Sequence, residues 1–467
     1  MLASIGKEKL MRKQNTHNVT GIIKTDKENI AFASEDFRFV FMKTDFLGDE
    51  TVLKADKSGY IWGITHEDTT IGIYSGTDIN IKSTRILNTW NYIVTKNLLP
   101  VEHMRFDGIR FENGSIKDIY PCNALHEIRD EKKPNLFIYK MDKDSRIFEL
   151  VSNGYETKWK FYSLVKQKNS VTEGDSISNA DSILDIEFNV PQNFSSLLDY
   201  YNQVCDFCSF LTFRNSVSFE KISLFKRIKR NQEKINVAFA ECCVKAPNVI
   251  SPRKWLNIIQ VHNLEETVFE NILKNAAKVN KKYKGLPLLI IPKDDRDAHT
   301  IDIGKIRHIC STLEMELNLE GVRLEKSPEI VDLIEKVKEM VQEYKKEQDK
   351  LRDVQESKKS NKMYDSIFGS IAHWDQPLAN RVCMAWDQHI SELEPFLRRY
   401  DIPITHESIE GFVKARNNIT HNGGTGVSDE VANTAFALMG LIYCCALTRL
   451  GMDSKAIADI MTRGIIG

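Results

Sequence analysis

The run Gly411–Gly424, GFVKARNNITHNGG, together with the apolar stretch Val431–Met452, VANTAFALMGLIYCCALTRLGM, decides the fold of the C-terminal part of the chain. Ile409, Phe412 and Val413 repeat at helical spacing, and an Asn-Gly-Gly sequence then ends the helical pattern. The apolar stretch is long enough to span a membrane, but polar residues interrupt it and no basic cluster flanks it. Because a helix that is apolar on most faces is typical of the centre of a bundle, we expect an all-α C-terminal domain and no membrane segment.

The same run places Arg416 and His421 five positions apart, at the end of the helical pattern. A guanidinium can hold a phosphate, and an imidazole titrates near neutral pH and can move a proton, so this pair could cut RNA without a metal. Spacing alone is weak evidence, since Arg12–His17 and Arg399–His406 have similar spacings in this chain. Only Arg416 and His421 combine an amphipathic helix with a helix stop.

The position of Arg416 on the predicted helix indicates that its guanidinium needs a partner. It follows Ile409 by seven residues, so it lies on the apolar face and requires an anionic partner. Asn417 and His421 are four residues apart, so the amide can orient the imidazole. Arg416 and His421, however, point about 140° apart on one continuous helix. We therefore expect a homodimer with a composite site; in the structural alternative, Arg416 only pairs with a buried acid.

Composition limits the class of protein. The 467 residues allow two or three domains, and 42% hydrophobic with 28% charged residues is ordinary for a soluble protein. A net charge of −1 creates no overall attraction for nucleic acid, so any RNA contact must use local basic clusters. Nine cysteines at irregular spacing, without a signal-peptide pattern, favour a reducing cytoplasm.

Motifs for bound metals or cofactors are missing from the sequence. Cys205 and Cys208 have zinc-like spacing but no second pair at a suitable distance, and the cysteine pairs at 242–243 and 444–445 suit core packing. The chain also lacks the GxxxxGK[ST], GxSxG and HExxH motifs. We therefore expect neither a metal site nor a cofactor.

Residues 1–192 have the pattern of an antiparallel β-rich domain. Short segments rich in aromatic and β-branched residues alternate with turns such as Asn113-Gly114, which suggests a sandwich or an open barrel. The polar run Lys166–Asp181 is expected to be a long exposed loop. The expected strands are Gly21–Thr25, Phe37–Met42, Tyr60–Thr65, Thr70–Tyr74, Met104–Phe111, Thr157–Leu164 and Ile183–Val190.

Residues 193–299 are expected to form a helical middle region, and 300–467 the all-α domain, so the chain as a whole is α+β and multidomain. In the middle region we expect helices at 216–245 and 252–283. The expected C-terminal helices are 303–319, 329–355, 363–373, 377–397, 406–421 and 429–450. Two basic clusters of the middle region could contact RNA or simply be exposed helix faces. They comprise Lys226, Arg227, Lys229 and Arg230, and residues 278–284.

Arg416, Asn417 and His421, in the order Arg-Asn-x-x-x-His before a long apolar helix, resemble the signature of the HEPN superfamily of RNases. The segment Ser311–Glu316 looks like the early HEPN helix that often carries an acidic residue, which implies a role for Glu314. The segments Tyr60–Ile64, Thr70–Tyr74 and Phe106–Phe111 look like those of the N-terminal domain in ApeA-type anti-phage proteins.

This resemblance implies a metal-independent endoribonuclease of abortive infection, acting on tRNA or another structured RNA. It implies attack of the RNA 2′-OH on the phosphate, with His421 as general base or acid, Arg416 stabilising the transition state and Asn417 positioning His421. A phage-derived trigger bound by the β-rich domain is also implied. Two alternatives stay open: a non-catalytic HEPN-like bundle for dimerisation or nucleotide binding, and the toxin of a toxin–antitoxin pair.

Overall fold

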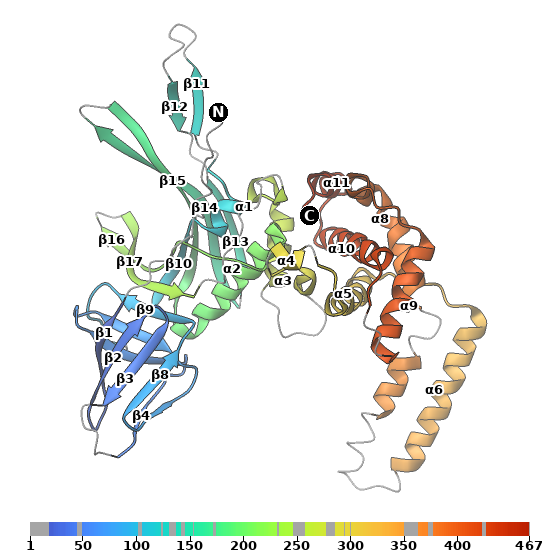
Figure 1. Cartoon of the computed structure of the whole chain (residues 1–467), viewed down its shortest axis with the longest axis horizontal. Coiled ribbons are helices and arrows are strands. Elements are labelled where there is room, and N and C mark those ends of the chain that lie inside the picture. The colour runs from blue at the N-terminus through green and yellow to red at the C-terminus, as the bar shows by residue number, and fades with distance from the viewer. Residues whose placement is uncertain are drawn as a thin grey trace. The chain divides into compact units, whose positions relative to one another are not determined.

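The structure is a computed structural model that shows two groups of elements, one mainly of strands and one of helices (Figure 1). It describes residues 18–43, 49–100, 105–122, 125–129, 137–141, 145–152, 154–170, 174–230, 233–245, 257–276, 285–293, 295–298, 300–349, 363–371, 377–422 and 426–466. The chain divides into two compact units: Met1–Lys281 with Ile291–Ala298, and Lys282–Ile290 with His299–Gly467.

The first unit is built on one sheet of 13 strands, in the order β13-β14-β15-β10-β16-β17-β9-β6-β5-β1-β2-β3-β8. Every strand pair described is antiparallel, which confirms the predicted antiparallel region. The strands of this sheet are β1 Thr20–Lys24, β2 Asn29–Glu35, β3 Arg38–Lys43, β5 Tyr60–Thr65, β6 Thr70–Tyr74, β8 Thr84–Asn88, β9 Asn91–Thr95, β10 Phe106–Glu112, β13 Ser145–Ser152, β14 Tyr155–Ser170, β15 Gly174–Gln192, β16 Lys221–Arg230 and β17 Glu233–Val244. Two smaller sheets pair β4 Thr51–Leu53 with β7 Ile79–Ile81, and β11 Leu125–Arg129 with β12 Phe137–Met141.

Two apolar cores lie along this sheet. Strands β1–β9 enclose one of them, in which Phe32, Phe39 and Tyr92 are almost fully buried. The other forms where α2 Leu197–Thr212 and α3 Glu266–Ala276 pack on β13–β15. There Phe269 of α3 contacts Phe148 and Phe161 of the strands. Aromatic residues on alternate strand positions therefore face these helices and bury one side of the sheet.

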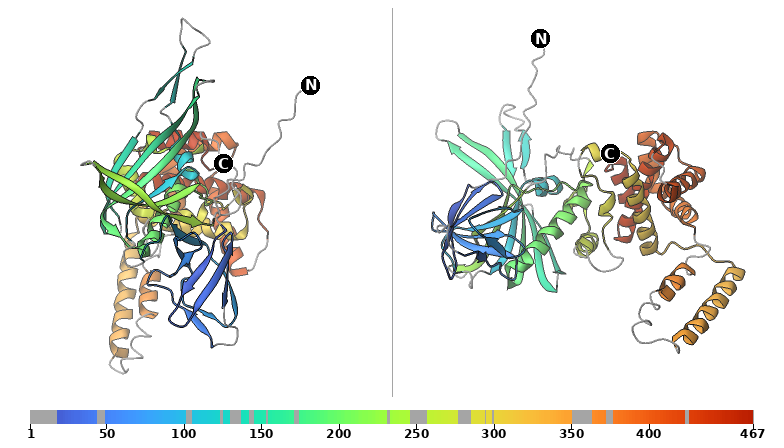
Figure 2. Two further views of the ribbon diagram at one scale, coloured as in Figure 1. Left: turned by 90° about the vertical axis from the view of Figure 1, so that its left-hand side faces the viewer. Right: turned by 60° about the horizontal axis from the view of Figure 1, so that its bottom comes forward.

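Two expectations for the first unit are wrong. Lys166–Asp181 is not a loop, because β14 and β15 pair through it, from Lys166 opposite Asn179 to Ser170 opposite Gly174. The polar side chains misled the prediction, since a hairpin ladder depends on backbone hydrogen bonds that any of these residues can make. Figure 2 shows this hairpin reaching beyond the neighbouring strands.

The middle region is also only partly helical. Residues 216–245 were expected to be helical but form β16 and β17, and β16 lies between β10 and β17 in the sheet. Because β16 has neighbours on both edges and mixes apolar with basic residues, its sequence lacks a clean strand alternation. Of the helix expected at 252–283, the described part contains α3 and the 3₁₀ turn η4 Val261–Asn263. Shorter helical elements of this unit are α1 Ser115–Ile119, η2 Phe194–Ser196 and α4 Asp295–Ala298.

The second unit is helical, as predicted, with η5 Leu288–Ile290 at its start. Its helices are α5 Ile303–Glu320, α6 Pro328–Asp349, residues 363–371, α8 Leu378–Tyr400, α9 His406–Asn422, α10 Asp429–Arg449 and α11 Ser454–Arg463. The six predicted helices are confirmed over their described residues, whereas predicted positions 350–355 and 372–373 lie outside these; α11 was not predicted. The helix at 363–371 runs beside α6, where Lys345 Nζ lies 5.7 Å from the Tyr364 ring (Figure 2).

Helix α10 is the centre of this bundle and contacts α5, α8, α9 and α11. By length and composition alone it could cross a membrane, but 72% of its most apolar window is buried inside the protein. Gly440 lies against Leu393 and Phe396 of α8, so a side chain there would crowd the contact between the two helices. The position of α10 in the bundle agrees with the predicted core helix.

Candidate functional site in the helical bundle

Arg416 lies on α9 next to its apolar face, as predicted. Ile409 and Phe412 of that face are buried, and the Arg416 side chain is 28% exposed. Its Nη2 lies 3.5 Å from Oε1 of Glu314 on α5, and its Nη1 donates to Asn417 Oδ1 at 3.0 Å. The guanidinium is therefore held at the surface of the bundle by a carboxylate and an amide, and it is accessible to solvent.

The structure brings together three of the four residues proposed for catalysis. Arg416, Asn417 and Glu314 form one contact set, although α5 and α9 lie far apart in sequence. The Asn417 carbonyl oxygen is directed to Arg416. The side chain of His421 and the expected contact between Asn417 and His421 lie outside the described residues.

The backbone of α9 continues without a break from His406 to Asn422. Positions 416 and 421 therefore keep the angular separation of a regular helix, about 140°, which was the reason for expecting a composite site. Lys414 and Glu410, one turn apart on the same helix, form an exposed ion pair of their own at 3.8 Å. Glu410 is thus engaged with Lys414, and the carboxylate beside Arg416 comes from α5.

Two further residues define the surroundings of Glu314. Cys310, one turn earlier on α5, is buried; burial raises the pKa of its thiol to about 12, an effect that Arg416 opposes. Arg381 of α8 is also buried, and burial lowers the pKa of its guanidinium while Glu314 acts in the opposite direction. Glu314 therefore acts on two guanidiniums, Arg416 and Arg381.

Sequence reasoning did not identify Arg381. It donates from Nε to the Val322 carbonyl at 3.1 Å and from Nη2 to Asn318 Oδ1 at 2.8 Å. A signal was present in the sequence: Arg381 falls on the buried stripe of α8 with Ala385 and His389, at spacings of four and eight. A charged residue on an apolar stripe indicates a structural or functional partner.

A second ion pair involves α5, the helix that carries Glu314, but this pair is buried. Arg449 at the end of α10 makes a two-pronged contact with Glu316, with both nitrogen–oxygen distances at 2.9 Å. The Glu316 side chain is 1% exposed, and burial raises its pKa despite Arg449. Arg449 also donates to the Gly285 carbonyl at 3.0 Å. This pair ties α5 to α10 and is inaccessible to a substrate.

The basic cluster on β16 does not form the continuous face that a helix would have given it. Successive strand residues point to opposite sides, so Lys226 and Arg227 diverge. Lys226 Nζ lies 5.1 Å from the Phe239 ring, and Arg227 donates to the Phe188 carbonyl. Lys229 is exposed, and the side chain of Arg230 lies outside the described residues, as does the cluster at 278–284. The cluster is therefore partly occupied by contacts within the protein.

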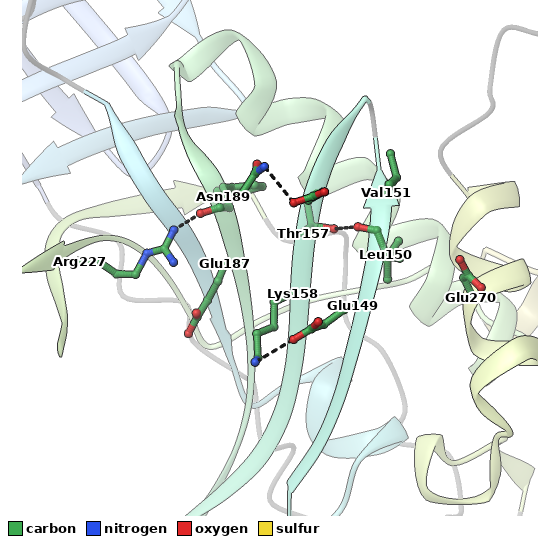
Figure 3. Close-up of a pocket in the computed structure, with 11 residues that line it drawn as sticks. Glu149, Leu150, Val151, Thr157, Lys158, Glu187, Asn189, Arg227 and Glu270 are labelled. Carbon is green, nitrogen blue, oxygen red and sulfur yellow. Dashed lines mark hydrogen bonds and ion pairs between the residues drawn. The ribbon is translucent and has the colours of Figure 1, made fainter. Parts of the chain in front are cut away.

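A hollow of about 520 Å³ lies on the first unit near Arg227 (Figure 3). Its charged lining is mostly acidic, with Lys158 and Arg227 as its cations, and Lys158 pairs with Glu149 at 3.0 Å. The acids are Glu149, Glu156, Glu187 and Glu270. This excess of carboxylates disfavours an RNA phosphate in the hollow.

A second hollow, of about 530 Å³, lies on the helical unit between α8 and α9. His406 Nε2 and Asp387 Oδ1 meet there at 2.8 Å, and both side chains are more than half exposed. Cys383 lines the same hollow, and burial raises the pKa of its thiol, which disfavours a reactive thiolate.

Comparison with protein-family models, with curated proteins and with solved structures finds no match to this chain.

Proposed function

We propose that the helical unit is a metal-independent endoribonuclease of the HEPN type. The observation that carries this proposal is the contact between Arg416 of α9 and Glu314 of α5, at 3.5 Å. The two residues come from separate segments that both resemble HEPN helices. A purely structural role for Arg416 would be served by a closer, more buried partner, such as the one that Arg449 has in Glu316.

Arg416 is suited to receive a phosphate. Its side chain is 28% exposed and that of Glu314 is 45% exposed, and ion pairs at such surfaces contribute only about 0–1 kcal/mol. A phosphodiester can therefore compete for the guanidinium at small energetic cost. In the unloaded site Glu314 and Asn417 keep the guanidinium in place, which limits the ordering that binding would require.

The proposed reaction breaks RNA at its own 2′-hydroxyl. The 2′-oxygen forms a bond to phosphorus as its proton passes to a base, and the bond from phosphorus to the 5′-oxygen breaks as that oxygen takes up a proton. The products are a 2′,3′-cyclic phosphate and a 5′-hydroxyl. We assign proton transfer to His421 and charge stabilisation to Arg416.

The remaining parts of the proposal concern assembly and control. Because positions 416 and 421 diverge on one helix, we propose a homodimer in which two copies of α9 form one site. We propose that the protein acts in the cytoplasm on tRNA or another structured RNA during abortive infection, and the free state of its cysteines supports a reducing compartment. The β-rich unit is the proposed sensor of a phage-derived trigger.

The test incubates the full chain with total cellular RNA in EDTA and maps the cut ends. Three proteins are compared: wild type, Arg416→Ala/His421→Ala, and the matched control Arg398→Ala/His406→Ala. The control removes an exposed arginine and an exposed histidine, which make ion pairs with Glu394 and Asp387. The proposal expects 2′,3′-cyclic phosphate ends from wild type and control only.

Absence of cleavage is resolved by adding lysate from infected cells. Cleavage that then appears for wild type and not for the site variant supports a triggered nuclease. RNA retention without any cutting, with or without lysate, would instead favour the non-catalytic bundle.

A further inference from the structure

The bundle contains a buried group of potential metal ligands away from Arg416. Glu320 is the last residue of α5, His389 lies in α8 and Cys445 lies in α10. One ligand atom from each residue lies within 4.8 Å of the other two. His389 and Cys445 are 5% and 1% exposed, so the group lies inside the protein.

Part of this group lacks hydrogen-bond partners. His389 Nε2 and Glu320 Oε1 are 2.9 Å apart. Among the residues that the structure describes, the other ring nitrogen of His389, Nδ1, and the other carboxylate oxygen of Glu320, Oε2, are buried without a partner. A buried polar atom left in this way costs about 1–3 kcal/mol. The two side chains therefore satisfy only part of each other's hydrogen-bonding capacity in this buried place.

Neighbouring contacts hold the three residues in position. Two turns before His389 on α8, Arg381 binds Val322 and Asn318, which flank Glu320 in sequence. One turn from both Glu320 and Cys445, the Glu316–Arg449 pair joins α5 to α10. Such fixed surroundings lower the entropy lost when a ligand binds.

We propose that Glu320, His389 and Cys445 bind a zinc ion that joins α5, α8 and α10. Imidazole, thiolate and carboxylate are all zinc ligands, whereas calcium and magnesium prefer oxygen ligands alone. With bonds of about 2.0–2.1 Å to nitrogen and oxygen, tetrahedral geometry requires those two atoms to be about 3.3 Å apart. The 2.9 Å between His389 Nε2 and Glu320 Oε1 therefore needs to widen by only a few tenths of an ångström.

The charges balance in the proposed site. Zn²⁺ with the Cys445 thiolate, the Glu320 carboxylate and a neutral His389 ring has no net charge, which suits a buried position. Binding releases the thiol proton of Cys445 to solvent. Water completes the tetrahedron, and the Glu320 side chain, which is 15% exposed, gives the ion a route inward. With three protein ligands and a water the proposed site keeps an open position, and it is independent of the proposed nuclease.

The first test is elemental analysis of the full chain purified without chelators. Wild type is compared with Cys445→Ala and with Cys444→Ala, which removes the adjacent buried cysteine. The proposal expects about one zinc per chain in wild type and in Cys444→Ala, and loss of the zinc from Cys445→Ala. Folding of each variant is checked by circular dichroism.

The second test works on wild type alone, so it holds even if Cys445→Ala fails to fold. Metal-stripped protein is titrated with Co²⁺, whose bond to a thiolate produces a charge-transfer band in the near ultraviolet. The expected result is saturation of this band at about one Co²⁺ per chain and a higher melting temperature. Folded, stripped protein that gives no thiolate band and takes up no stoichiometric zinc would overturn the proposal. Neither readout depends on RNA cleavage, so this failure is separate from failure of the nuclease.

Discussion

Glu314 and Arg416 are 102 residues apart in sequence, and their side chains meet at 3.5 Å across α5 and α9. The contact combines a guanidinium that can bind a phosphate with a carboxylate that holds it in place. Arg381, buried on α8, adds a second positive charge on which Glu314 acts. This arrangement leads to a first prediction about the division of roles between the two residues.

Replacing Arg416 should impair cleavage far more than replacing Glu314. We expect Arg416→Ala to lose about 100–1,000-fold in kcat, as when one stabilising donor is removed from a transition state. Glu314→Gln keeps the size of the side chain and removes only its charge, so we expect a loss of about 10-fold or less. Single-turnover cleavage of a defined RNA measures both. An equal loss for the two variants would contradict a purely positioning role of Glu314.

The Arg449–Glu316 pair should matter for stability and not for chemistry. Glu316→Ala leaves Arg449 without its buried carboxylate, and we expect a loss of about 3–5 kcal/mol in the free energy of unfolding. Urea denaturation followed by circular dichroism measures this. Asp332→Ala is the control, because its ion pair with Lys336 is exposed and should contribute about 0–1 kcal/mol.

Stability of the first unit should fall as pH rises between about 4 and 7 through Asp206. Burial raises the pKa of Asp206 to about 7 in the folded protein, so the carboxyl is favoured there in its protonated form. This contribution is fully present below the unfolded pKa, about 3.9, and is lost as pH rises through the folded pKa. Because part of the side chain reaches water, we expect a change of about 1–2 kcal/mol.

Asp206→Asn tests this pH dependence, since asparagine does not titrate in this range. Unfolding of the variant should depend less on pH than that of wild type, and the variant should be the more stable protein at pH 8. Asp199→Asn, at an exposed position of the same helix, serves as the control for the exchange of aspartate for asparagine. Parallel pH profiles for wild type and Asp206→Asn would contradict the assignment.

Arg227 should contribute to the stability of the folded protein and not to RNA binding. Its guanidinium donates to the Phe188 carbonyl, so Arg227→Ala should destabilise the protein by about 1–3 kcal/mol. Lys229→Ala, two residues along the same strand and exposed, should have little effect on stability. Thermal melts measure the difference. RNA affinity at several salt concentrations should keep the same slope for Arg227→Ala, because no phosphate contact is lost.

Local sequence patterns were sufficient to predict most helices of the second unit. The spacing of apolar residues in α5, α8 and α9 repeats every turn, and α10 is apolar on most faces; both signals lie within the segment itself. Strand assignments failed where the deciding partner lies elsewhere: β16 pairs with β10, more than a hundred residues earlier. For residues 166–181, polar composition suggested a loop although the backbone forms a hairpin ladder.

The sequence by itself determined the helical segments between residues 303 and 450, the antiparallel character of the N-terminal region and the choice of Arg416 as a residue in need of an acid. Only the tertiary structure decided which acid that is, because the packing of α5 on α9 places Glu314 within reach. It also decided that Glu320, His389 and Cys445 converge, although they lie on three helices and share no sequence motif. The physical reason is range: helical periodicity is a property of neighbouring residues, whereas contacts between side chains of different helices depend on how those helices pack.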